Sequence, residues 1–278
     1  AEVAMECGLP TPEATPLIIG GRPTINGEMP WHVGIYRKMS EVLLCGGTIV
    51  SATAVISAAH CFWIDFKGQL PASDYLVAAG KIYSTLNYIL LQIKEIKIPK
   101  LFHGSLSNFQ EDISVLILKK ALVLGRHVRP ACISFDATFN KDQLQDGNVG
   151  KVSGWGLTEP NGVLSLYLKT LEMPYITKEK CISAKMLCRE LFARYYLRGV
   201  ISTAPTNEDR CNAYTYATMT SIFEHKELRY FIGQLYHCFC TLSFHICKGG
   251  LRSCNTEFRC RRHACSFAPY PIKRNYNY

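Results

Sequence analysis

One stretch of the chain reads Thr48-Ile-Val-Ser-Ala-Thr-Ala-Val-Ile-Ser-Ala-Ala-His60-Cys61-Phe62. β-branched residues dominate it as far as Ser57, and a Ser-Ala-Thr corner interrupts them, so the stretch predicts two short strands. It then ends in two alanines, a histidine and a cysteine. Small residues let another backbone come close, and a cysteine is able to tether the turn. A histidine held in this way is a candidate general base, although a lone histidine at a strand end is more often a core residue.

The composition indicates a globular protein from an oxidising compartment. The chain has 278 residues, of which 48% are hydrophobic and 19% charged, and this balance argues against disorder. It contains 13 cysteines, too many for a cytosolic protein without a metal motif, so we expect a secreted, extracellular protein. The odd number leaves at least one thiol unpaired or bonded to another chain. The first residue is Ala1 rather than Met, which indicates a processed or truncated product.

The net charge of +9 is concentrated near the C-terminus. Residues 224–278 hold nine Lys and Arg against three Glu, whereas the rest of the chain carries a net charge of only +3. Clustered basic residues are most often a solvated surface, so we expect neither nucleic acid nor a membrane as a partner. Residues 230–247 contain no Asp, Glu, Lys or Arg, but Gln234, His237 and His245 among them argue against a membrane span.

Short β-like runs separated by turn residues predict an all-β chain in two halves, as barrels or sandwiches. Residues 1–17 are rich in proline and predict an extended linker. The predicted strands of the first half are 33–36, 43–50, 54–57, 75–79, 88–98 and 113–118. Those of the second half are 150–155, 166–174, 195–203 and 217–223. Residues 177–189 and 224–236 are candidates for short helices.

Four motifs in this order resemble the trypsin/chymotrypsin-like serine endopeptidases. The motifs are Ile18-Ile-Gly-Gly21, Cys45-Gly-Gly47 with Ala58-Ala-His60-Cys61, Glu111-Asp112-Ile-Ser-Val-Leu116 and Val152-Ser-Gly-Trp-Gly156. A weaker fifth motif is Gly199-Val-Ile-Ser202. The resemblance covers residues 18–235. The chain is also similar to the modular serine proteases of arthropod body fluid, because Leu17 rather than Arg or Lys precedes Ile18.

The resemblance implies a double six-stranded β-barrel with the site between the barrels. The first barrel would cover about 18–128 and the second about 129–235. His60 is then the general base, and Asp112 is the carboxylate that orients it and stabilises the imidazolium. By itself, Asp112 before an apolar strand would more often be a turn or cap residue. No cofactor and no metal are implied.

The resemblance also implies two disulfides and an activation cleavage. Cys45–Cys61 would tie the turn that carries His60 to the preceding strand, and Cys7–Cys132 would keep a cleaved prefix, residues 1–17, attached. The cleaved bond would be Leu17–Ile18, which places a new N-terminus at Ile18.

The serine of this family is missing from the chain. No Gly-Asp-Ser-Gly-Gly string exists, and Cys247-Lys-Gly-Gly-Leu-Arg-Ser253-Cys254, the nearest in composition, lies after the strand that it should precede. Only 17 residues separate Cys181 from Gly199, too few for the family's intermediate helix, pocket floor and serine turn. The nucleophile, the oxyanion hole and the pocket floor are therefore absent, so we expect a catalytically inactive chain with an incomplete second barrel.

The tail, residues 236–278, lies beyond the resemblance and holds six cysteines. Its cysteines and histidines follow no regular ligand spacing, so a zinc site is less expected than a small disulfide cluster. Most expected is an irregular, disordered segment that shares its origin with the deleted block.

Three functions remain open. The first is a secreted serine endopeptidase that acts on protein substrates. The second is a non-catalytic homologue that binds partner proteases in an extracellular cascade. The third is a truncated product without activity. Foldedness distinguishes the second from the third.

Overall fold

Six strands close into the first of the two barrels that the sequence predicts. A computed structural model describes residues 7–10, 22–80, 82–84, 90–107, 109–156, 164–175, 197, 199–203 and 218–221. All of them belong to one compact unit, residues 1–237. The expected cleavage bond Leu17–Ile18, the two expected helices at 177–189 and 224–236, and the tail lie outside the described residues.

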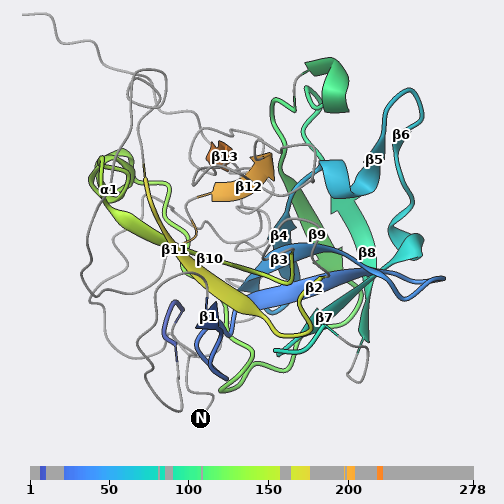
Figure 1. Ribbon diagram of the computed structural model, residues 1–278. Coiled ribbons are helices and arrows are strands. Elements are labelled where there is room, and N and C mark those ends of the chain that lie inside the picture. Colours follow the sequence, from blue (N-terminus) through green and yellow to red (C-terminus); the bar gives the residue numbers. More distant parts are fainter. Residues whose placement is uncertain are drawn as a thin grey trace, which may run out of the picture. The chain divides into compact units, whose positions relative to one another are not determined.

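The first barrel is an antiparallel sheet closed in the order β2-β3-β4-β9-β8-β7 (Figure 1). Its strands are β2 (His32–Arg37), β3 (Leu43–Ser51), β4 (Ala54–Ser57), β7 (Tyr75–Ala79), β8 (Leu90–Lys97) and β9 (Ser114–Leu118). The structure therefore confirms the all-β class and the first six-stranded barrel.

Large apolar side chains fill the barrel. Val33 and Ile35 from β2 point inward beside Ile49, Val55 and Phe62, and all of these are fully buried. Burying such a side chain stabilises the fold by about 1.5–3 kcal/mol. The β3 strand passes close to them, because a Cβ on Gly47 would lie 2.8 Å from the Val55 side chain.

The β2 strand is buried on its outer face as well, which explains its almost continuous burial. Outward-facing His32 packs on the Trp155 ring, at 5.0 Å between ring centroids. Tyr36 donates a hydrogen bond from its hydroxyl to the Ser84 carbonyl at 2.8 Å. The burial raises the pKa of Tyr36 to about 12. A second layer therefore covers this side of the barrel.

That second layer contains a three-stranded antiparallel sheet in the order β1-β11-β10. Its strands are β1 (Arg22–Pro23), β11 (Lys169–Pro174) and β10 (Val149–Gly154). A separate two-stranded ribbon pairs β12 (Gly199–Thr203) with β13 (Thr218–Ser221). In the ranges that the structure describes, these strands form two separate sheets.

A small hairpin that the sequence analysis did not predict follows His60. It pairs β5 (Trp63–Ile64) with β6 (Gly68–Gln69). The Asp65 carboxylate accepts hydrogen bonds from the backbone N–H and the hydroxyl of Ser105. Gly104, at φ +61°, lies so close that a Cβ there would overlap Asp65. The hairpin is thus attached to the segment that leads toward Asp112.

A short helix, α1 (Ala137–Gln143), is also absent from the predicted elements. Asp136 caps it, because its carboxylate accepts a hydrogen bond from the Phe139 N–H at 2.7 Å. Within the part of the chain that the structure describes, no helix has the length and apolarity needed to cross a membrane.

Candidate functional site

His60 lies where the sequence places it, just beyond a buried strand. All four residues of β4 are buried, and Ala58 and Ala59 after them are 5% and 0% exposed. His60 then begins a short 3-10 helix, η1 (His60–Phe62). Because Phe62 is anchored in the barrel core, the imidazole has a fixed position at the surface, with 37% of its side chain exposed.

Strand pairing brings Asp112 to His60. The antiparallel register of β4 and β9 pairs Ser57 with Ser114. Continuing this register places Asp112 opposite Ala59, directly beside His60. Asp112 is fully buried, and its two carboxylate oxygens accept bonds from the His60 N–H and Nδ1, each at 2.8 Å. This contact holds Nδ1 as the donor and leaves Nε2 free to accept a proton.

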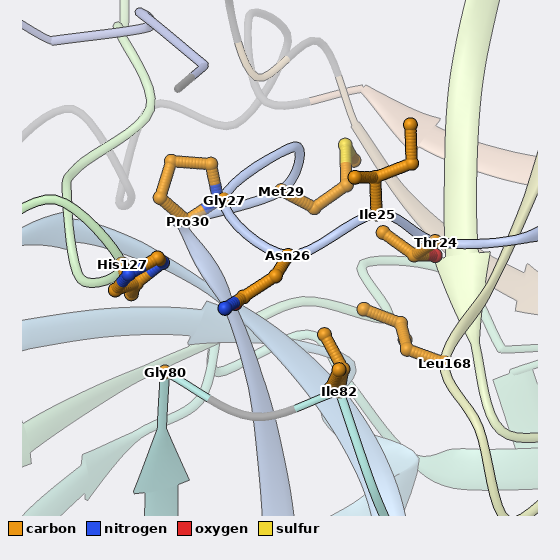
Figure 2. Close-up of a pocket in the computed structure, with 10 residues that line it drawn as sticks. All are labelled: Thr24, Ile25, Asn26, Gly27, Met29, Pro30, Gly80, Ile82, His127 and Leu168. Atoms are coloured by element: carbon orange, nitrogen blue, oxygen red, sulfur yellow. The ribbon is translucent and has the colours of Figure 1, made fainter. Parts of the chain in front are cut away.

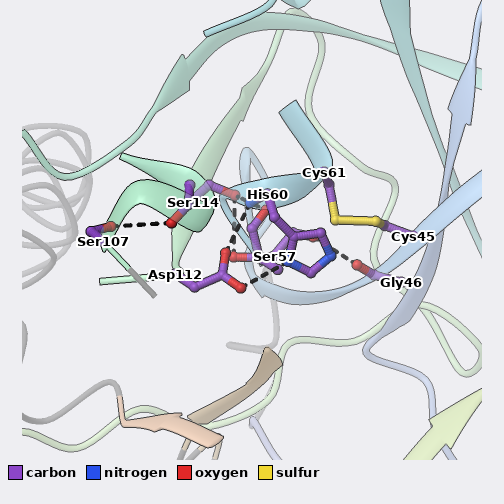
Figure 3. A network of polar contacts seen from close by, with 10 residues as sticks. Cys45, Gly46, Ser57, His60, Cys61, Ser107, Asp112 and Ser114 are labelled. Atoms are coloured by element: carbon purple, nitrogen blue, oxygen red, sulfur yellow. Dashed lines mark hydrogen bonds and ion pairs between the residues drawn. A yellow bond between two sulfur atoms is a disulfide. The ribbon is translucent and has the colours of Figure 1, made fainter. Parts of the chain in front are cut away.

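Two serines, which the sequence analysis did not single out, hold the turn before His60 (Figure 3). The Ser114 hydroxyl lies 3.1 Å from the carbonyl oxygens of both Ser57 and Ala58. The Ser57 hydroxyl donates to the Gly46 carbonyl at 2.8 Å. Both serines are 1% exposed. The one available signal was Ser114, a polar residue at the start of the otherwise apolar run 113–118.

A disulfide links Cys45 to Cys61 across the same turn, as the resemblance implies (Figure 3). The two sulfurs and a His60 ring nitrogen lie within 4.8 Å of one another, a spacing that suits a metal ion. Metal ligation requires thiolates, and both sulfurs are consumed in the disulfide. These three residues therefore do not fit a metal while the disulfide is intact.

The loop before Asp112 has an unusual backbone. Phe109 and Glu111 adopt φ values of +55° and +60°, which are rare for residues with a side chain. The Phe109 ring meets the His60 imidazole edge-on at 6.2 Å between centroids. The Ile113 N–H bonds back to the Glu111 carbonyl at 2.7 Å, so Asp112 lies at the centre of a tight turn. The sequence analysis missed Phe109, because no local pattern marks it.

Comparison with known protein families identifies the family of this chain. The family model described as Trypsin matches residues 18–212, more than half of the 278 residues. The chain belongs to the trypsin family. The matched range includes His60 and Asp112.

Three curated relatives come from arthropods, as the sequence analysis predicts. "Modular serine protease" of Drosophila melanogaster is 28% identical over 242 aligned positions, covering 73% of this chain and 38% of the relative. "Clotting factor G beta subunit" of Tachypleus tridentatus is 31% identical over 167, covering 59% and 52%. "Clotting factor C" of the same species is 27% identical over 183, covering 63% and 18%. The trypsin-family chain thus spans about half, or less, of the length of these relatives.

The other disulfide implied by the family resemblance joins Cys7 to Cys132. It fastens residues 7–10 to the segment that leads out of the barrel. Gly8 donates from its N–H to the Pro130 carbonyl at 2.9 Å, and Arg129 donates to the Leu9 carbonyl at 3.4 Å. A prefix held in this way stays attached whatever happens to the bond before Ile18.

A small pocket lies elsewhere in this trypsin-family unit, under the turn that precedes β2 (Figure 2). Asn26 and His127 supply its polar groups, and Ile82 and Leu168 supply apolar ones. The space open to the centre of a water molecule is about 10 Å³, enough for about one water. The pocket shares no residue with the His60 site and is too small for a peptide side chain.

Proposed function

We propose that this chain is a secreted, non-catalytic member of the trypsin family that binds partner proteins of an extracellular protease cascade. One observation carries the proposal. His60 Nδ1 and the Asp112 carboxylate are in contact at 2.8 Å, as a base and its orienting carboxylate would be, but the sequence contains no Gly-Asp-Ser-Gly-Gly turn to present a nucleophile.

The chemistry makes this loss decisive. A nucleophile has to lie about 2.6–3.2 Å from the base, and backbone N–H groups have to face the developing oxyanion. In the family both come from the serine turn. Losing the nucleophile removes most of the triad's contribution, and losing the oxyanion donors with it leaves no residual rate to expect.

The alignment with "Modular serine protease" supports a deleted block. The 73% of this chain that it covers is about 203 of 278 residues. About 39 of the 242 aligned positions therefore have no residue in this chain. The total suits a chain that lacks a block of residues, as expected between Cys181 and Gly199.

The folded barrel and its disulfides support a role in binding outside the cell. Cys45–Cys61 and Cys7–Cys132 persist only in an oxidising environment. The printed names of the relatives include two clotting factors, and this supports a place among cascade proteins and in immunity. Cleavage at Leu17–Ile18 leaves the prefix attached through Cys7–Cys132. It produces no activity, because the acid that receives the new N-terminus belongs to the missing block.

The experiment is an activity test on the purified full chain with trypsin as the positive control. We expect no turnover of a peptide ester and no labelling by an active-site phosphonate, before or after cleavage at Leu17–Ile18. Turnover that disappears in His60→Ala would contradict the proposal. A cooperative melt and monodisperse elution separate a folded binding protein from an inactive fragment. Transcript sequencing across Glu190 and Tyr195 tests whether the deletion is real.

The second candidate is an active endopeptidase, and the intact 2.8 Å contact between His60 Nδ1 and Asp112 favours it. Its nucleophile would have to come from outside the described residues. Ser253, in the glycine-containing run of the tail, is the nearest in composition to the family serine. Phosphonate labelling that is lost in Ser253→Ala would support this candidate and overturn the first.

A further inference from the structure

A buried histidine lies between the first barrel and the three-stranded sheet, away from the His60 site. His32 begins β2 and is 8% exposed. One side of its ring packs on the backbone of β3, where a Cβ on Gly46 would lie 3.1 Å from the ring. The other side meets the Trp155 ring, at 5.0 Å between centroids and 47° between planes. The imidazole is therefore enclosed by both parts of the structure.

Trp155 is held by hydrogen bonds from both sides of this contact. It directly follows β10 and is 3% exposed. Its indole N–H donates to the Ile82 carbonyl at 3.3 Å, and its carbonyl accepts from the Ser165 N–H at 3.1 Å. Because Trp155 is fixed, a movement of the His32 ring also displaces the indole and the end of β10 that carries it.

Protonation of His32 would place a positive charge on a buried ring. Its Nε2 is buried and has no hydrogen-bond partner among the described residues. Gly46 from β3 and Trp155 from the end of β10, which enclose the ring, do not titrate. Two charged residues lie four positions before His32 and Trp155 in the sequence. They are Glu28 and Lys151, and they form an ion pair with one another at 3.4 Å. Burial alone accounts for the pKa of His32, which is lowered to about 4.

We propose that the contact between His32 and Trp155 is an acid-sensitive junction. Protonation of the buried imidazole displaces Trp155 from its contact with β2, while the barrel stays folded. The barrel stays folded because its core residues and its closed hydrogen-bonding pattern do not involve the His32 ring.

The direction of the effect follows from the two protonation equilibria. In the open state the solvated imidazole regains the ordinary pKa of 6.5, and in the closed state its pKa is about 4. The closed state is fully favoured above pH 6.5 and loses stability as the pH falls from 6.5 to 4. One pKa unit corresponds to a tenfold change, so the ratio of open to closed rises about 30-fold by pH 5 and approaches about 300-fold below pH 4.

The experiment measures the protection of the Trp155 indole N–H against hydrogen exchange between pH 7.5 and 4 by NMR. The chain has three tryptophans, and Trp155→Phe assigns the signal. In the wild type we expect protection, corrected for the intrinsic exchange rate, to fall about 30-fold by pH 5 while the barrel amides stay protected. His32→Gln should abolish this dependence. His103→Gln, which removes an exposed imidazole, should keep it.

Two results would overturn the proposal. One is an unchanged pH dependence in His32→Gln. The other is loss of Trp155 protection only together with the barrel amides, which would mean global unfolding. If His32→Gln fails to fold, the pKa of the His32 ring is measured in the wild type by NMR instead. A pKa near 6.5 in the closed state would contradict the proposed junction. Peptidase activity does not enter this experiment, so its outcome is independent of the proposed function.

Discussion

The two parts of this chain differ in how their sheets end. In the first barrel each of the six strands pairs with two neighbours, so the sheet closes on itself. In the second part, the described strands form an open three-stranded sheet and a separate two-stranded ribbon. The comparison shows that the closed barrel forms one continuous sheet, whereas the described strands of the second part form two separate sheets.

The largest effect is expected from a substitution that creates a cavity in the core of the closed barrel. Phe62 is fully buried and meets the Tyr75 ring edge-on at 4.9 Å. We expect Phe62→Ala to lower the free energy of unfolding by about 3–5 kcal/mol, measured by chemical denaturation. Phe66→Ala is the matched control, because Phe66 is 94% exposed, and should change it by less than about 0.5 kcal/mol. Equal effects of the two changes would mean that the barrel does not determine stability.

A second test removes the disulfide within the barrel. Cys45 and Cys61 lie 16 positions apart in the sequence, and closing a loop of that length is worth about 3 kcal/mol. We expect the double variant Cys45→Ser with Cys61→Ser to unfold at lower denaturant by that amount. The His60 amide, which bonds to Asp112 at 2.8 Å, should also exchange faster. Unchanged exchange of this amide would show that the disulfide does not hold the site.

The gentlest test asks whether the open sheet unfolds together with the barrel. The Thr170 hydroxyl in β11 bonds to the hydroxyls of Thr24 at 2.6 Å and Ser153 at 2.9 Å. Thr170→Val keeps the shape but removes these bonds, so we expect a loss of about 1 kcal/mol in the barrel's denaturation curve. No shift in that curve, with a separate early transition by circular dichroism, would show that the sheet unfolds independently.

Local patterns were sufficient to predict most of the strands. The predicted ranges 54–57 and 75–79 coincide with β4 and β7, because each is a short β-branched or apolar run between turn residues. In the second half, 150–155 and 217–223 lie within about one or two residues of β10 and β13. The contact between His60 and Asp112 could be predicted because the motifs that contain them occur in the order known from the trypsin family.

Features that depend on distant contacts were not predictable in this way. The β5–β6 hairpin is held by Asp65 bonding to Ser105, and nothing near Asp65 in the sequence reveals that partner. His32 looks like any polar residue at the start of a strand until Trp155 is placed against it. Helix α1 did offer a signal, since Asp136 is a standard N-cap, but its residues show no amphipathic pattern and none of them is buried.

Closure of the first barrel also bears on self-association. An unpaired strand edge offers N–H and C=O groups to which another chain can add a strand. The six barrel strands have no such edge, because β2 and β7 pair and complete the cycle. Copies of this chain that aggregate would therefore be joined through other segments. Hydrogen exchange on the aggregate should then find the barrel amides as protected as in the monomer.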